Sequence, residues 1–383
     1  MQKNVRSRLF RDSKRLFCLC LIGFILSSAA GCSGFGANAM HNSRAEYNTA
    51  LQRSNDQQLL ANIVSLRYAQ SPSFLEIDGI TAQFSINAEA SAGVEHERED
   101  ASRLTRTDLF SLGGSIGYSS DPTITFTPLR GEAFLEQFLS PIELKKIMLL
   151  YNSGWTLKRL FRLTVQSING IPNAKRASGP ISENPPAFQK FEEVIDLMRD
   201  LEKQNLLEFM YETYDDKTEI SLVLKKEAWS LNETVRMADL LGIVSGKTHY
   251  DVIYRSFRAD EKARRQAIML ETRSLLGVLF FLSHSVAVPD QDLAENIVRV
   301  TRQANGAPFD WSKVLHDAFS VKSSQNPPAS PAVAVKYRNN WFYINENDIS
   351  SKATLMLVSQ LFALQSGSAE HVTPILTLPV GRK

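Results

Sequence analysis

The chain has 383 residues, of which 43% are hydrophobic and 22% are charged, so it holds enough apolar material for a sizeable globular core. Its 19 glycines and 15 prolines are close to average and exclude collagen-like and wholly disordered chains. Six basic residues and one acidic residue precede residue 16, so the formal net charge changes from +2 for the whole chain to −3 without that segment. We therefore expect no nucleic-acid partner, because the body carries no excess of positive charge.

All three cysteines, Cys18, Cys20 and Cys32, lie near the N-terminus. The residues beyond Cys32 therefore have no thiol for an intrachain disulfide, a thiolate metal site or a cysteine nucleophile. We predict no metal and no cofactor.

Residues 1–31 have the three parts of a secretory signal: a basic segment to Arg15, an apolar segment over 16–25 and small residues up to Gly31. The apolar segment is short for a transmembrane helix, which needs about 20 residues. We therefore expect the signal to be cleaved from the mature protein.

The four residues Ala29-Ala30-Gly31-Cys32 resemble the lipobox of bacterial lipoproteins, with alanine at the position where leucine is usual. This resemblance implies cleavage between Gly31 and Cys32 and acylation of Cys32, which would fix the protein to membrane lipid. The alternatives are an ordinary cleaved signal and an uncleaved anchor. Serine rather than aspartate at position 33 favours the outer membrane, facing the periplasm, in a bacterium with two membranes.

The hydrophobic periodicity predicts an α+β fold in five segments: the signal over 1–31, the lipid anchor and tether over 32–53, an α+β domain over 54–170, a linker over 171–186 and a second α+β region over 187–383. We expect helices at 54–70, at 140–153 after Ser140-Pro141, and at 155–168, 188–204, 232–242, 259–282 and 347–364, with a short helix opened by 309–311. The predicted strands start at Phe74 and cover 84–94, 108–118, 123–127, 207–212, 219–224, 333–337, 341–344 and 374–380.

Three segments resemble catalytic or nucleotide-binding motifs, and each fails a requirement of its chemistry. Gly113-Gly114-Ser115-Ile116-Gly117 matches a hydrolase nucleophile elbow, but Ser115 lies inside a strand pattern and no helix follows. The stretch 242–248 has one residue too few for a phosphate-binding loop, so we interpret Gly242 as the end of a helix. His96-Glu97 begins like a zinc-protease motif without the second histidine. The other histidines are single, and we expect structural or solvated roles for them.

The two strands predicted at 84–94 and 108–118 form a long amphipathic hairpin. Each has 11 residues, within the 9–11 that a tilted strand needs to cross a bilayer. One hairpin cannot span lipid alone, because its edges leave backbone groups unpaired, but hairpins from several copies can close a barrel. The alternative is a hairpin in a soluble sheet with one face packed on helices, which gives the same alternation.

Segments across the predicted mature chain resemble a functionally uncharacterised group of bacterial envelope lipoproteins. They are Gln57 to Val64 with Leu66-Arg67-Tyr68, Arg273 to Leu279, Trp341 to Ile344 and Leu376 to Val380. The resemblance implies a location in the envelope and brings no activity or catalytic residue.

The favoured hypothesis is a lipid-anchored envelope protein without catalytic activity, with a structural or protein-interaction role. Its expected partners are membrane lipid, through acylated Cys32, and an envelope protein or a second copy of the chain. One alternative is an oligomeric assembly subunit that inserts the hairpin at 84–118 into the outer membrane. Another is an envelope hydrolase whose serine, histidine and acid converge only in the fold.

Overall fold

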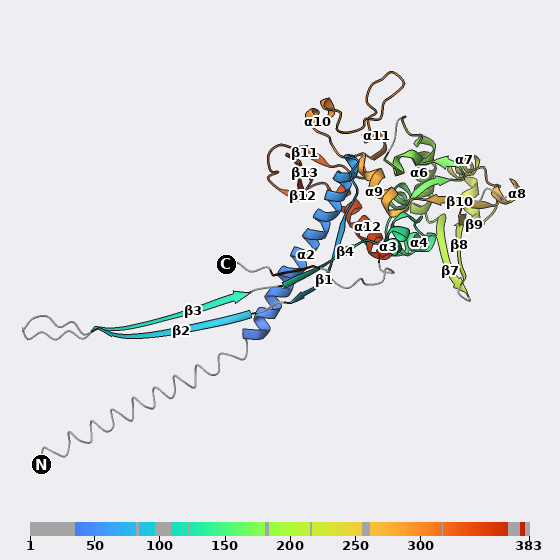
Figure 1. Cartoon of the computed structure of the whole chain (residues 1–383). Helices are drawn as coiled ribbons and strands as arrows, with labels where there is room; N and C mark the ends of the chain where they lie inside the picture. Colours follow the sequence, from blue (N-terminus) through green and yellow to red (C-terminus); the bar gives the residue numbers. More distant parts are fainter. Residues whose placement is uncertain are drawn as a thin grey trace, which may run out of the picture.

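The computed structural model of the chain describes residues 35–81, 84–95, 109–120, 123–180, 184–214, 217–254, 261–315, 317–366 and 376–379 (Figure 1). Within these ranges, helices and mainly antiparallel strands alternate irregularly, which confirms the predicted α+β class. Gly31 and Cys32, with the rest of the predicted signal, lie outside the described residues.

The helices are α2 (Phe35–Arg67), α3 (Glu132–Leu139), α4 (Leu144–Asn152), α5 (Leu157–Thr164), α6 (Gln189–Lys203), α7 (Asn232–Leu241), α8 (Glu261–Arg264), α9 (Leu275–Ser283), α10 (Asp290–Ala294), α11 (Ser312–Leu315) and α12 (Ile349–Ser366), with the 3-10 turns η2 (Lys175–Ser178) and η3 (Lys226–Ser230). The strands are β1 (Phe74–Thr81), β2 (Phe84–Glu95), β3 (Leu109–Ser120), β4 (Thr123–Leu129), β5 (Val165–Ile168), β6 (Ile171–Pro172), β7 (Leu207–Tyr214), β8 (Lys217–Leu224), β9 (His249–Tyr254), β10 (Ala267–Thr272), β11 (Lys322–Ser324), β12 (Pro331–Tyr337), β13 (Asn340–Asn345) and β14 (Leu376–Pro379).

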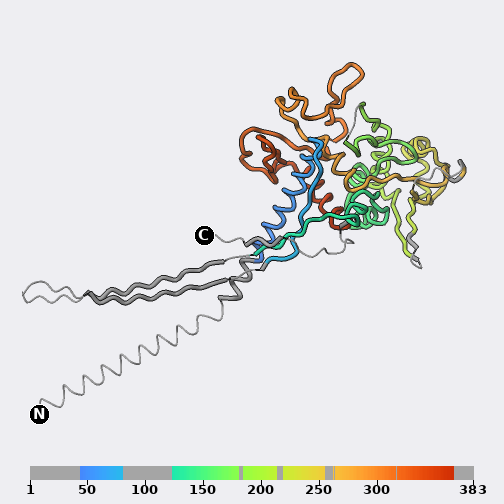
Figure 2. Tube along the Cα trace, viewed as in Figure 1, coloured from blue at the N-terminus to red at the C-terminus, as the bar shows by residue number. Residues whose placement is uncertain are grey.

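Helix α2 packs against elements from several regions of the chain (Figures 1 and 2). Its C-terminal half carries Leu60, Ile63 and Val64, all fully buried, at the three- and four-residue spacing of one helix face. This face contacts α9, β12 and α12, so α2 lies between the β11–β13–β12 sheet and the helices of the body.

The predicted start of the first helix at residue 54 was wrong, because α2 is continuous from Phe35. The described part of the predicted tether, residues 35–53, is therefore helical. This stretch contains no proline and several strong helix formers, and the buried half of the helix provides a nucleus from which helical structure extends. Ser54, the predicted first residue of this helix, therefore lies inside it.

The largest sheet has the order β6-β5-β10-β9-β8-β7, with β9 and β10 parallel and the other neighbours antiparallel. Strand β5, before the predicted linker at 171–186, pairs with β10, after it. The linker range itself contains β6 and η2. Buried side chains from both predicted regions form one hydrophobic core.

Helices α5 and α6 cover this sheet through large apolar side chains. Phe161 and Phe191 are fully buried, and the ring of Phe161 lies 5.3 Å from that of Phe209 on β7. Each buried ring of this kind contributes about 1.5–3 kcal/mol by its removal from water. This packing holds α5 and α6 against the sheet, where α5 leads directly into β5 and α6 is followed by β7.

The two helices predicted near residue 150 are confirmed as α4 and α5, but the start of the first and the end of the second were wrong. Ser140 does not cap the start of a helix; it ends α3, which the sequence analysis missed, and Pro141 forms an isolated bridge with Ser274. The helix predicted at 155–168 ends at Thr164, where Val165 to Ile168 turn into β5. β-branched residues favour a strand, and tertiary pairing with β10 decides the outcome here.

The long helix predicted at 259–282 was also wrong. The described part of this range forms α8, then β10, then α9. Strand β10 is almost wholly buried, and a buried apolar strand has no alternation that distinguishes it from a buried helix. Ser274 begins α9 by accepting a hydrogen bond from the backbone N–H of Gly277.

The predicted hairpin is confirmed as β2 and β3. The strands pair in an unbroken antiparallel register from Phe84 opposite Ser120 to Glu95 opposite Leu109. The hairpin keeps the register of the neighbouring β1–β4 pair, in which Thr81 lies opposite Thr123. Within the described residues β2 and β3 pair only with each other, so this part of the ribbon has two strands.

Candidate functional site

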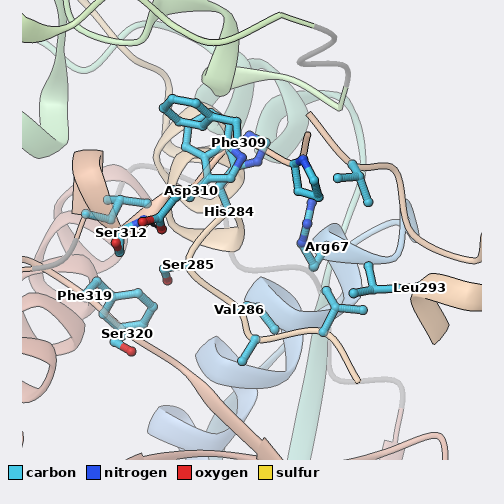
Figure 3. Close-up of a pocket in the computed structure, with 16 residues that line it drawn as sticks. Arg67, His284, Ser285, Val286, Leu293, Phe309, Asp310, Ser312, Phe319 and Ser320 are labelled. Atoms are coloured by element: carbon cyan, nitrogen blue, oxygen red, sulfur yellow. Dashed lines mark hydrogen bonds between the residues drawn. The ribbon is translucent and has the colours of Figure 1, made fainter. Parts of the chain in front are cut away.

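A cavity of about 490 Å³ lies where the C-terminal ends of α2 and α9 meet the chain before α11 (Figure 3). Arg67 and Leu293 lie on one side of it, and Phe319 and Ser320 lie on the other. The volume falls in the range of about 300–1,000 Å³ that is typical of ligand pockets.

Arg67 is the last residue of α2, where the helix dipole favours a cation. Its Nη1 donates to the carbonyl oxygen of Arg299 at 3.1 Å, and its buried Nε–H has no hydrogen-bond acceptor. No carboxylate of the described residues forms an ion pair with it. Burial lowers the pKa of Arg67 to about 10, so the guanidinium stays charged at neutral pH.

His284 follows α9 and stacks on Trp311, with ring centroids 3.9 Å apart and an angle of 13° between the planes. Neither ring nitrogen of His284 forms a hydrogen bond, and the buried indole N–H of Trp311 also has no acceptor. The pKa of His284 is lowered to about 3, mainly by burial and in addition by the charge of Arg67, while the backbone of Ala177 partly opposes them. The imidazole is therefore neutral at pH 7.

A second, smaller cavity of about 170 Å³ has Arg67 and His284 in its wall as well. Its other lining residues include Tyr68, whose hydroxyl donates to the carboxylate of Asp292 at 2.6 Å. Arg67 and His284 therefore line both cavities at the C-terminal end of α2.

The rest of the large cavity is lined mainly by apolar side chains, among them Val286, Phe309 and Phe319. Asp310 also lines it, and its carboxylate accepts a hydrogen bond from the backbone N–H of Ser312 at 2.9 Å. Figure 3 shows Asp310 beside Ser312, on the side opposite to Arg67.

This arrangement gives no support to hydrolase chemistry. Serine, histidine and aspartate all line the cavity, but His284 holds no hydrogen bond to a nucleophile or to an acid that would orient it. A general base works best with a pKa near the operating pH, and the pKa of His284 is far below that.

The motifs discounted in the sequence behave as structural elements where they are described. Ser115 lies in the middle of β3, away from any strand-to-helix turn. Gly242 ends α7 in the left-handed conformation, with φ of 63°. The segment around His96 and Glu97 lies outside the described residues.

The part of the chain that the structure describes contains no cluster of three or more metal-ligating side chains. Within the same ranges, no helix combines the length and apolar character that a membrane span requires. Comparison of the chain with protein-family models, curated proteins and solved structures gave no match.

The sequence analysis missed the cavity because its residues are far apart in the chain. It assigned Arg67 to the first helix, His284 to the single histidines and Trp311 to a short helix, without linking them. No local spacing connects positions 67, 284 and 311, so only the fold brings these side chains together.

Proposed function

We propose that the protein is a lipid-anchored component of a bacterial cell envelope that acts through protein interaction and not through catalysis. The layout of residues 1–31 and the lipobox-like sequence before Cys32 support the anchor. The observation that carries the interaction role is the long β2–β3 hairpin, whose two strands pair only with each other within the described residues.

The register of this hairpin sorts its residues onto two different faces. Cross-strand partners share a face, so Ile86 with Tyr118, Ala92 with Leu112 and Val94 with Phe110 belong to one apolar face. Serine and glycine dominate the opposite face. A lone two-stranded ribbon is only marginally stable in water, and its two edges present unpaired backbone groups to other strands. A partner that pairs with these edges or covers the apolar face would stabilise the hairpin.

The anchor is tested by a Cys32→Ser variant, with Cys18→Ser as the matched control inside the predicted signal. We expect Cys32→Ser to lose metabolic labelling by fatty acid and to leave the membrane fraction, while Cys18→Ser behaves as wild type. Intact mass of the wild-type protein should correspond to a chain starting at residue 32 with added acyl mass. A mature chain that lacks acyl mass would rule out the anchor.

The interaction role is tested with a photo-crosslinking amino acid at Asn87 on β2, in native membranes. The matched control places it at Glu233, an exposed residue of α7. We expect a crosslinked product of defined mass from position 87 and none from position 233. The same amino acid is also placed at positions 88 and 112, on the apolar face. A hairpin that gives no product at 87, 91, 88 or 112 would contradict the role proposed for it.

A second candidate function follows from the length and regularity of the same strands. β2 and β3 have 12 residues each and pair without a bulge, which is sufficient for a tilted strand to cross a bilayer. Hairpins from several copies could then close into a barrel, which leaves no free edge in lipid. Mass photometry of detergent-extracted protein distinguishes the two, because a strict monomer excludes the barrel and a closed oligomer that is lost on deletion of 84–120 supports it.

A further inference from the structure

Among the described residues two arginines, Arg162 and Arg273, are buried, and their charges are compensated; Arg67 is partly buried and forms the third case compared with them. Arg273 is completely buried and donates hydrogen bonds to Ser178 and to the backbone carbonyls of four further residues, Arg162, Leu163, Val165 and Asn173. Arg162 forms ion pairs with Asp317 and Glu192. Both therefore follow the rule that buried charges are compensated.

Arg67 is the exception among these three. Its only hydrogen bond within the described residues is the one to the carbonyl of Arg299, and no carboxylate there offsets its charge. It also differs in place, because it stands in the wall of the 490 Å³ cavity. A partly desolvated cation in the wall of a cavity favours an anion as ligand, and the described residues do not supply one that pairs with it.

The other residues that line the cavity indicate the chemical character of the uncharged part of such a ligand. Trp311 is 7% exposed and holds an unpartnered N–H, and Phe309 meets its ring edge-on at 5.2 Å. Val286 and Phe319 add apolar surface. His284 is neutral, and Asp310 lies across the cavity, so Arg67 provides the one cationic group among the lining residues.

We propose that this cavity is a binding site for a small organic carboxylate, whose charged end contacts Arg67 and whose apolar body packs between Trp311, Phe309 and Val286. A single cation suits a monoanion better than a multiply charged phosphate. The apolar walls favour a ligand with a hydrocarbon or aromatic body over an inorganic ion, because burial of that body removes it from water.

The test is isothermal titration of the full-length protein, extracted from membranes in detergent, with 3-phenylpropionate as the probe. Titrations into empty micelles correct for partition of the probe. We expect binding of 3-phenylpropionate at one site per chain. The affinity for 3-phenylpropanol, which has the same apolar body without the charge, should be lower by about tenfold or more. Inorganic phosphate, which has charge without the body, should show no heat of binding.

Variants assign the charge contact to Arg67. Arg67→Gln should weaken the binding of 3-phenylpropionate about tenfold or more, and Arg67→Lys should weaken it less, because it keeps the positive charge. The matched control is Arg236→Gln, which removes an exposed arginine that pairs with Glu193 on the surface of α6 and α7. Arg236→Gln should bind the probe as wild type does.

A stability measurement separates a ligand contact from a structural one. Arg67→Gln removes a partly buried charge that forms no ion pair with the described residues, so the urea midpoint of the ligand-free variant should equal or exceed that of wild type. A clearly lower midpoint would make Arg67 a structural residue and overturn the proposal. Equal affinity of wild type and Arg67→Gln, no binding of 3-phenylpropionate to wild type, or phosphate binding of equal strength would each overturn it as well.

Discussion

The buried imidazole of His284 should make the stability of this protein fall in mild acid. Its pKa is about 3 in the folded protein, against an ordinary value of 6.5, so the unfolded chain binds a proton that the folded chain rejects. The stability that this group contributes is therefore complete above pH 6.5 and is lost as the pH falls from 6.5 towards 3. Between pH 7.5 and pH 5, linkage gives a loss of about 2 kcal/mol from this group alone.

The assay is urea denaturation at both pH values for wild type and for His284→Phe, which keeps an aromatic ring against Trp311 and cannot titrate. The free energy of unfolding of wild type should fall by about 2 kcal/mol more than that of the variant over this range. Other groups contribute equally to both proteins and cancel in the comparison. His249→Phe, at an exposed position of β9, serves as the control and should follow wild type. An identical pH dependence in wild type and His284→Phe would refute the reasoning.

Two further predictions concern stability, and each is measured by urea denaturation at pH 7.5. Arg273→Met should lower the free energy of unfolding by about 3 kcal/mol or more, because it leaves several buried carbonyls without the donors that now satisfy them; a loss below about 1 kcal/mol would show that these carbonyls find other partners. Gly242→Ala should cost about 1 kcal/mol, because φ is 63° and the added Cβ meets no atom within 4 Å, so only backbone strain acts; an unchanged midpoint would contradict this assignment.

Elements with a clear period and local end signals could be predicted from the sequence. The apolar face of α6, the pairs β7–β8 and β12–β13 and the alternation of β2 and β3 all depend on residues that are close together in the chain. Local preference failed where tertiary pairing decides the conformation. Strands β5 and β10 lie in stretches that resemble helices, and each is a strand because it pairs with the other.

The cavity could not be predicted for a related reason. Arg67, His284 and Trp311 reach it from α2, from the end of α9 and from the chain before α11, and no spacing in the sequence encodes their meeting. The sequence places Arg67 at the end of the apolar face formed by Leu60, Ile63 and Val64. An arginine at such a position is explained equally well by a salt bridge. The absence of an ion pair from the described residues emerges only in three dimensions.

The three-stranded sheet β1-β4-β14 has a consequence for how the protein matures. Its third strand, β14, consists of residues 376–379, which pair with residues 123–126 of β4. The strands β4 and β14 are separated by some 250 residues, so β14 can pair with β4 only after that length of chain has been synthesised. Pairing across so large a separation is slow. A chain that stops short of residue 376 would keep one side of β4 open, and an open side of this kind recruits foreign strands.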